Sequence, residues 1–493
     1  MAFESFAQFV QTLETAGELK RIRQPVATEL EITELADREM KSPGGGRALL
    51  FEQPTVNGQV SPFPLAINTL GSHRRMALSL GAASVEEVAA QLGSLIQPKP
   101  PASFSEALKL LGTALELRHA KPKQVSRGPC QEIIHRQADL PSAAPGGCPT
   151  LLSLPILKCW PLDAGRFITL PCVVTKDPDT GARNVGMYRM QIFDPQTTGL
   201  HWQLHKVAAR HGKRYFQTGQ RMPVSVFLGG DPVFTFCATA PLPDGLDEFL
   251  LAGYLRKRAI ELVPCVSNDL EVPAGADFVI EGYVDPQEPL RTEGPFGDHT
   301  GYYSLADLYP AFHVTAITHR RDAIYPATVV GMPPMEDFYI GTASVKLFLP
   351  VLKMNFPELV DLALPAEGVF HNLVFASIKK SYPMQAYKIM HGLWGMGQMM
   401  FTKYIIVVDD DVDVHNTSEV LFRLCATTDP QRDALFTRGP ADVLDHATTE
   451  LAIGSKLGLD ATRKLPGEGF KRPWPPLIKM DAEIKRKIDR LQI

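Results

Sequence analysis

Two acidic side chains, Glu293 and Asp298, have the types and spacing that proton chemistry requires. They flank a Gly-Pro-Phe-Gly turn in the segment RTEGPFGDHTGYY, 291–303. Two carboxylates that face one pocket across such a turn repel each other, so burial separates their pKa values and lets one hold a proton. Glu-Gly-Pro and Gly-Asp are also ordinary turn sequences, and Asp298 could simply cap the residues that follow.

Arg189 is a candidate partner for these acids. It follows Tyr188 on a predicted strand, so the two side chains point to opposite faces. An arginine inside a barrel needs an anion, and a bidentate carboxylate pair suits it best. Glu293 or a substrate carboxylate would serve, whereas a surface position on the solvated face is the alternative.

Three further side chains could bind a metal ion. Asn184, His205 and Glu248 offer an amide, an imidazole and a carboxylate. This mixture suits Mn²⁺ or Mg²⁺ shared with a phosphate better than it suits zinc, and a phosphorylated cofactor would complete the coordination. By spacing alone, His201, His205 and His211 could equally be surface or core residues, and Asn184 could belong to the preceding turn.

Composition narrows the class of protein. The chain has 493 residues, is 45% hydrophobic and 21% charged, and therefore has enough apolar material for two or three domains. A net charge of -4 without a run of Lys or Arg gives no basis for binding nucleic acid. We find neither a signal peptide nor an apolar stretch of about 18 residues that would span a bilayer, and we expect a cytoplasmic protein.

The cysteines do not indicate a disulfide framework or a structural zinc site, because they are scattered and form no CxxC pair. Cys172 and Cys425 stand in apolar sequences, which is typical of inert thiols in a core. Seven cysteines are present, at positions 130, 148, 159, 172, 237, 265 and 425.

The chain divides into parts with different patterns. Up to about residue 120 the signals are mixed α/β: Phe6, Phe9 and Leu13 recur at helical spacing, and Ser84 with Glu87 makes a capping box. The Pro-rich residues 97–128 indicate a linker region, in which Ala107, Leu111 and Leu115 predict a helix.

The middle part, to about residue 325, has the pattern of a mostly antiparallel barrel or sandwich. Its main exception is a helix predicted over 246–257. Short β-branched and aromatic runs predict strands at 167–176, 185–193, 200–205, 223–230, 234–238, 277–284 and 312–319.

The last part alternates strands with helices, which suits a parallel or mixed sheet. Strands are predicted at 371–380 and 403–412, and the first helix at 343–354. Near the end, Ile484, Ile488 and Leu491 form one apolar stripe on a helix, which we expect to pack on a neighbour such as another subunit.

The order of several motifs resembles the UbiD family of decarboxylases, over nearly the whole chain. Several long motifs in one order are far more specific than one short motif. They are ELKRI (18–22), LLFE (49–52), NVGMYRMQ (184–191), HWQLHK (201–206), VSNDLEVPAGADFVIEGY (266–283), EGPFGDHTGYY (293–303), TKYIIVVDDDV (402–412) and GSKLGLDAT (454–462).

The resemblance implies an α/β (α+β) fold built around a split β-barrel that binds prenylated FMN. The expected domains are an N-terminal α/β domain (1–120), the barrel (121–325), a C-terminal α/β domain (326–472) and a terminal helix for oligomer contact (473–493). In the family a divalent metal, usually Mn²⁺, anchors the flavin phosphate, with K⁺ nearby. Such proteins form homo-oligomers, here a dimer or a hexamer, and depend on a flavin prenyltransferase for the cofactor.

The resemblance also assigns residues. Asn184, His205 and Glu248 fall on the metal ligands, and Arg189, Glu293 and Asp298 on the catalytic arginine and acids, with Asp298 as proton donor. This chain carries Gln203 and Val207 where related sequences often carry Leu and Gly, which puts those two contacts in doubt. The segments that contact the cofactor contain Asn184, Met187, Tyr188, Arg189, His201, Trp202, Gln203, His205, Lys206 and Val207.

The implied reaction is the reversible, non-oxidative decarboxylation of an aromatic or α,β-unsaturated acid. Loss of CO₂ from an sp² carbon requires an electron sink that no side chain supplies, so the flavin must provide it. Arg189 would orient the substrate and stabilise Glu293 as an anion, while Asp298 would be neutral and donate the proton. Which acid carries the proton at each step stays open.

Asp298 and the following HTGYY resemble the ubiquinone-pathway branch, so the expected substrate is a quinone precursor such as 3-polyprenyl-4-hydroxybenzoate. Contact with a membrane is expected only for such a polyprenylated substrate. The alternatives are a naphthoate of menaquinone synthesis or a smaller phenolic or heteroaromatic acid. A protein that binds or assembles flavin without turnover is a hypothesis of another class, against which the intact arginine and acids argue.

Overall fold

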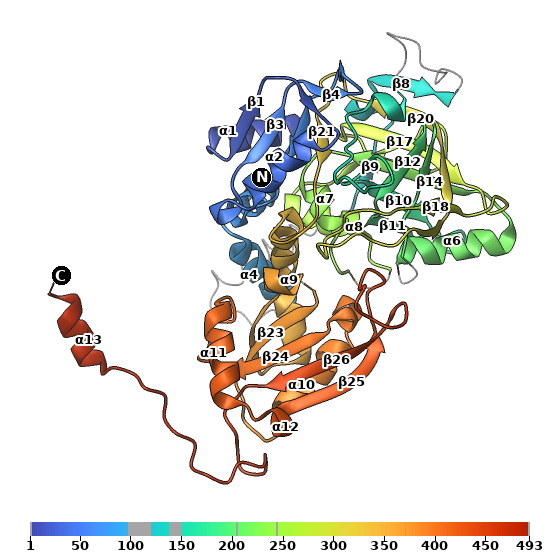
Figure 1. Cartoon of the computed structure of the whole chain (residues 1–493). Coiled ribbons are helices and arrows are strands. Elements are labelled where there is room, and N and C mark those ends of the chain that lie inside the picture. The colour runs from blue at the N-terminus through green and yellow to red at the C-terminus, as the bar shows by residue number, and fades with distance from the viewer. Residues whose placement is uncertain are drawn as a thin grey trace, which may run out of the picture.

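The computed structural model describes residues 2–96, 120–137, 150–203, 206–242, 245–369 and 371–491. These residues form a mixed α/β structure with three main sheets, shown in Figure 1. The helix predicted around residues 107–115 and the predicted metal ligand His205 lie outside the described residues.

The N-terminal unit is a four-stranded sheet with helices packed on it. The strand order is β1-β3-β6-β21, so a strand that follows the barrel in sequence completes this sheet. Phe6, Phe9 and Leu13 are buried on α1, as their spacing predicts. The capping box also forms, because the Glu87 amide donates to Ser84 Oγ at 3.2 Å. The elements are α1 (Phe6–Thr15), β1 (Leu19–Ile22), β3 (Ala48–Phe51), β6 (Leu65–Ile67), β21 (Tyr325–Ala327) and α4 (Val85–Ile96).

The middle unit is a curled sheet in which neighbouring strands pair antiparallel along the path from β11 to β9. Its order is β11-β10-β14-β17-β20-β13-β12-β9, and β8 also pairs with β20. The strands are β8 (Ile133–Arg136), β9 (Phe167–Ile168), β10 (Cys172–Lys176), β11 (Arg183–Met187), β12 (Met190–Asp194), β13 (Thr197–Gly199), β14 (Met222–Leu228), β17 (Phe278–Val284) and β20 (Ala311–His319).

Tyr188 and Arg189 join two distant edges of this sheet. β11 is one edge strand and β12 lies next to the other edge, yet only these two residues separate them in sequence. Two residues span only about 7 Å of extended chain. The sheet must therefore curl until its edges approach, and Arg189 lies at the point where they meet. The curled half-barrel confirms the predicted fold class.

Two predicted strands are wrong. Residues 234–238 lie in helix α7 (Val233–Cys237) and its C-cap, and all five helical residues are buried, so no polar face reveals the helical period. Residues 200–203, the described part of the predicted strand 200–205, do not form a strand, because the Trp202 amide donates to the Leu200 carbonyl at 3.0 Å and turns the backbone locally. The predicted helix 246–257 is confirmed as α8 (Glu248–Arg256).

The C-terminal unit is a five-stranded mixed sheet, as predicted. Its order is β22-β23-β24-β26-β25, with parallel pairs at β23–β24 and β24–β26. Alternate residues of β24 enter two hydrophobic clusters, one with α10 and one with α11, so helices cover both faces. The elements are β22 (Leu359–Ala363), β23 (Leu373–Ile378), α10 (Gln385–Trp394), β24 (Tyr404–Asp409), α11 (Thr417–Thr427), β25 (Ala434–Pro440) and β26 (Ile453–Asp460).

Helix α9 (Glu336–Asn355) connects this unit to the other two, and it lies between them in Figure 1. Ile340 and Leu347 pack with α1 and α4, whereas Leu349 and Leu352 pack on the C-terminal cluster. The helix begins seven residues before the predicted start at 343, and Glu336 and Asp337 in its first turn favour this position.

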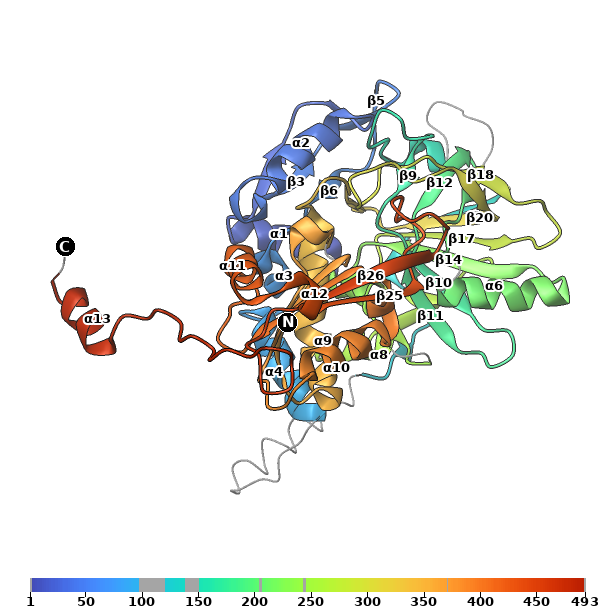
Figure 2. The same cartoon turned by 60° about the horizontal axis from the view of Figure 1, so that its bottom comes forward.

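The C-terminal arm leaves the body, and helix α13 (Ala482–Asp489) lies at its far end with every residue exposed (Figures 1 and 2). No helix in the described ranges has the length and apolar character to cross a bilayer. The remaining elements used below are α6 (Val207–Thr218), β18 (Arg291–Glu293) and β19 (Asp307–Tyr309).

Candidate active site

The two predicted acids lie on a hairpin. β18 pairs antiparallel with β19, so that Glu293 is opposite Asp307, and the loop 294–306 between the strands carries Asp298. Gly294 has φ +89°, which a side chain would strain, and its amide donates to Gln191 Oε1 at 2.8 Å. The loop is thereby tied to β12, the strand that follows Arg189.

The second glycine of the turn allows a close approach. A Cβ on Gly297 would lie 2.2 Å from Cδ1 of Trp160, and the Gly297 amide donates to Asp163 Oδ1 at 2.7 Å. The intervening Phe296 packs on Phe167, with 4.5 Å between ring centroids. The Gly-Pro-Phe-Gly sequence is therefore required by packing as well as by turn geometry.

Arg189 joins the two acids. Its Nε and Nη2 donate to Glu293 Oε1 and Oε2 at 2.8 and 3.1 Å, and its Nη1 donates to Asp298 Oδ2. Nη2 also donates to Ser304 Oγ at 3.0 Å, and the guanidinium lies 4.7 Å from the ring centroid of Phe296. The structure thus brings together the three residues predicted to be catalytic, and their side chains are at most 9% exposed.

Three residues that the sequence analysis did not assign to this chemistry extend the network. His299 Nδ1 lies 3.0 Å from Asp298 Oδ1, and Tyr309 Oη lies 3.4 Å from His201 Nε2. His201 Nδ1 in turn lies 3.0 Å from Glu293 Oε2. Ser304, Tyr309 and His299 follow the acids closely in sequence, and that proximity was the available signal.

The expected division was one charged and one neutral acid, whereas this arrangement favours the ionised form of both. Burial by itself raises the pKa of Glu293, but hydrogen bonds from His201 and Arg189 outweigh it and hold the pKa at about 2. Burial likewise raises the pKa of Asp298, but the charge of Arg189 and the hydrogen bond from His299 keep it well below its usual range. Because Arg189 lies between the two carboxylates, it favours the ionised form of both.

Two of the three predicted metal ligands lie close together. Asn184 on β11 and Glu248 at the start of α8 are both buried, and Glu248 Oε2 accepts a hydrogen bond from the neighbouring Val185 amide at 2.8 Å. Burial raises the pKa of Glu248 to about 7. A divalent cation would offset this cost, and amide and carboxylate oxygens fit Mn²⁺ or Mg²⁺.

The predicted cofactor segments also converge. The His201 amide donates to the Arg189 carbonyl at 3.2 Å, which joins residues 201–203 to the β11–β12 junction. Trp202 packs against Gly212 of α6, where a Cβ would lie 2.9 Å from the indole. Met187 ends β11, Gln203 is half-buried, and Val207 begins α6.

These segments fit an anionic group. Burial lowers the pKa of Lys206, the residue that precedes α6, although the charge of Asp442 opposes this. Helix N-termini and lysines favour phosphate, so the start of α6 suits the phosphate of a flavin nucleotide. Tyr188 is buried in the core, but Tyr188 and Arg189 lie between β11 and β12 and not on a strand as predicted.

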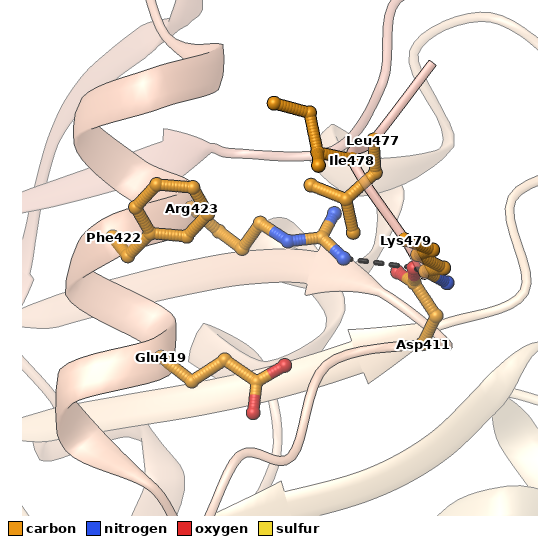
Figure 3. A pocket seen from close by; sticks show the side chains of 7 residues that line it. All are labelled: Asp411, Glu419, Phe422, Arg423, Leu477, Ile478 and Lys479. Atoms are coloured by element: carbon orange, nitrogen blue, oxygen red, sulfur yellow. Dashed lines mark hydrogen bonds and ion pairs between the residues drawn. The ribbon is translucent and has the colours of Figure 1, made fainter. Parts of the chain in front are cut away.

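Other candidates lie elsewhere. Cys172 is buried as predicted and burial raises its pKa to about 12, but Cys425 is exposed on α11, so its predicted burial is wrong. Figure 3 shows a pocket between α11 and residues 477–479, where Arg423 and Asp411 pair at 2.8 Å. This pocket contains none of the residues of the Arg189 network.

Three family models match the chain. They are described as the N-terminal domain, the Rift-related domain and the C-terminal domain of 3-octaprenyl-4-hydroxybenzoate carboxy-lyase, and match residues 10–95, 123–333 and 338–461. An uncharacterized protein of Archaeoglobus fulgidus is 46% identical over 493 residues, which cover 100% of this chain and 98% of that protein. One of Aquifex aeolicus is 46% identical over 489 residues, 99% and 98% of the two chains.

Solved structures share the whole architecture. The closed form of vanillic acid decarboxylase from Sedimentibacter hydroxybenzoicus has a TM-score of 0.85 at 25% identity, covering 100% of this chain and 99% of that one. The UbiD-class enzyme HmfF from Pelotomaculum thermopropionicum, in complex with FMN, has a TM-score of 0.79 at 25% identity and covers 99% of both. An evolved dimeric form of HmfF, in complex with prFMN, has a TM-score of 0.76 at 26% identity and covers 96% and 97%.

Proposed function

The chain belongs to the UbiD family of decarboxylases, and on that premise we propose that it is a carboxy-lyase that uses prenylated FMN. It removes CO₂ from an aromatic or α,β-unsaturated carboxylic acid without net oxidation. The single observation that carries this proposal is Arg189, which holds Glu293 and Asp298 together in a buried site between two sheet edges.

The cofactor would be held by the segments around Met187, Trp202 and Lys206. Asn184, Glu248 and His205 would bind the metal, which we propose to be Mn²⁺, with K⁺ as a second ion. When bound, the prenylated flavin supplies the electron sink for the carbon that loses CO₂. Support comes from the FMN and prFMN complexes of the HmfF structures.

Arg189 positions the reacting groups. Its bidentate pair with Glu293 fixes the plane of the guanidinium, so the charge is presented in one direction. A substrate carboxylate that approaches the Arg189 guanidinium competes with Asp298 for its positive charge. Glu293 stays ionised, because His201 and Arg189 both hold it.

Asp298 delivers the proton. A second anion beside Arg189 weakens the stabilisation that the arginine gives to the Asp298 carboxylate, so substrate binding raises the pKa of Asp298 and lets it take up a proton. The carbon–carbon bond to the carboxylate breaks, CO₂ leaves, and the Asp298 proton bonds to the carbon that carried it.

We propose 3-polyprenyl-4-hydroxybenzoate as the substrate. The three matching family models are described by the octaprenyl form of this acid, and Asp298 followed by HTGYY is the sequence feature that supports it. We also propose that the protein is a cytoplasmic homo-oligomer. A flavin prenyltransferase supplies its cofactor, and it contacts a membrane only to reach its prenylated substrate.

The test is product analysis with protein made together with a flavin prenyltransferase. We expect CO₂ release, and exchange of hydrogen for deuterium at the vacated carbon, with 3-polyprenyl-4-hydroxybenzoate. Activity only on a naphthoate or a small phenolic acid would show that the proposed substrate is wrong and that the proposed decarboxylation is right. Flavin bound without release or exchange on any acid tested would instead indicate a flavin-binding protein without turnover.

A further inference from the structure

A second cluster of ligating side chains lies beside the acid hairpin. His299, His371 and Asp442 each offer one ligand atom, and these atoms lie within 4.8 Å of one another. Their side chains are 15%, 18% and 13% exposed. His299 belongs to the loop of the middle unit, whereas His371 and Asp442 belong to loops of the C-terminal unit, so the cluster joins the two.

Hydrogen bonds already orient all three groups. His299 Nδ1 lies 3.0 Å from Asp298 Oδ1, and His371 Nδ1 lies 3.0 Å from the Val369 carbonyl. Both acceptors hold a proton on Nδ1, so Nε2 is the nitrogen of each ring that can offer a lone pair to a metal ion. Asp442 Oδ1 accepts from the Leu444 amide at 2.9 Å, while its Oδ2 lies 3.5 Å from His371 Nε2.

This arrangement is the usual one around a transition metal. A histidine ligand commonly donates its other ring N–H to a carboxylate or a backbone carbonyl, which fixes its tautomer. Here the acceptor is the Asp298 carboxylate for His299 and the Val369 carbonyl for His371. The centroids of the two rings are 5.0 Å apart. Two imidazoles with one carboxylate suit Zn²⁺, Co²⁺ or Fe²⁺ better than Mg²⁺ or Ca²⁺.

We propose that His299, His371 and Asp442 bind a divalent ion of the zinc class, which ties the loop that carries Asp298 to the C-terminal unit. This site is separate from the one assigned to Asn184 and Glu248. It shares no ligand with the flavin segments, and it does not depend on the proposed reaction. The ion would hold His299 in place and, through its Nδ1–H, the orientation of Asp298.

Cobalt titration of the full-length protein, stripped of metal by a chelator and free of flavin, tests this site. The background is Glu248→Gln, which removes the other candidate site. We expect one equivalent of Co²⁺ with the absorption bands of a low-coordinate site. His371→Gln and Asp442→Asn should each weaken binding by at least about tenfold, because each removes a ligand. Zn²⁺ should displace the cobalt and raise the thermal midpoint of the parent protein.

His415→Gln is the matched control. His415 pairs with Asp361 at 3.1 Å in the same C-terminal unit, but that pair is exposed and is not part of a three-residue cluster. Its substitution should leave cobalt binding unchanged. Circular dichroism of each metal-free variant shows whether it is folded, and anomalous diffraction from zinc-soaked crystals of the unmodified protein locates the ion without any variant.

Two results would overturn the proposal. One is the absence of cobalt binding in the Glu248→Gln background together with no anomalous peak at the cluster. The other is binding that His371→Gln leaves intact.

Discussion

Arg189 donates hydrogen bonds to both carboxylate oxygens of Glu293, at 2.8 and 3.1 Å, although the two residues are 104 positions apart in the chain. The same guanidinium donates to Asp298. Arg189 is therefore one cation between two buried anions, and a third anion that enters the site competes with them for its charge.

Glu293→Gln should lower turnover by at least about a hundredfold, because Arg189 loses a charged, bidentate partner and its orientation. Flavin content, measured by absorbance after purification, should be retained. The control is Glu288→Gln, because Glu288 is an exposed residue that pairs with His313 at 2.6 Å, and its substitution should leave turnover unchanged. Equal losses in both variants would remove Glu293 from the mechanism.

Asp298→Asn should abolish proton delivery. We expect the rate of hydrogen–deuterium exchange into the product or a product analogue to fall below about one hundredth of the wild-type rate. NMR in D₂O measures this rate. Asp307→Asn is the matched control, because Asp307 is exposed on β19 opposite Glu293. If Asp298→Asn exchanges at the wild-type rate, another group donates the proton.

The ion pair of Glu293 should make stability depend on acid pH. Its pKa in the folded protein, about 2, is below its ordinary value of 4.5, so its stabilisation is complete above pH 4.5 and is lost as the pH falls toward 2. The difference in thermal midpoint between wild type and Glu293→Gln should therefore be constant at neutral pH and shrink below pH 4.5. A difference that grows on acidification would contradict the assigned pKa direction.

Glu248→Gln should remove the metal of the proposed flavin site. Loss of the carboxylate leaves Asn184 as the only described oxygen ligand of the predicted trio, so we expect Mn²⁺ content, measured by mass spectrometry, to fall at least about tenfold with a parallel loss of flavin. Glu261→Gln serves as control, since Glu261 pairs with Lys123 on the surface. Unchanged manganese in Glu248→Gln would mean that the metal is bound elsewhere.

Gly297→Ala should destabilise the acid hairpin. The added Cβ would lie 2.2 Å from Trp160, so Trp160 or the loop must shift, at a cost of about 1–3 kcal/mol. Urea denaturation measures this loss. Gly165→Ala is the matched control, because its Cβ would meet its nearest atom at 3.7 Å, an ordinary contact. Equal stability of the two variants would show that the hairpin accommodates the methyl group.

Local sequence signals were sufficient for the elements that have a clear period. The β-branched and aromatic runs of β17 and β20, the helix α8 and the capping box at Ser84 all follow from residues close in sequence. Residues 234–238 were misread because a short apolar run buried on every side is compatible with strand or helix. The choice between the two depends on packing around the run.

The sequence by itself determined the family, the curled-sheet fold class and the candidate residues, because each rests on ordered motifs and local periodicity. Only the tertiary structure decided that Arg189 reaches both acids. The sheet curls until its β11 edge approaches β12, which lies next to the other edge. It also decided that Arg189 lowers the pKa of both acids, and that His299 lies near His371 and Asp442. Charge and coordination depend on distances between segments far apart in the chain, and folding alone sets those distances.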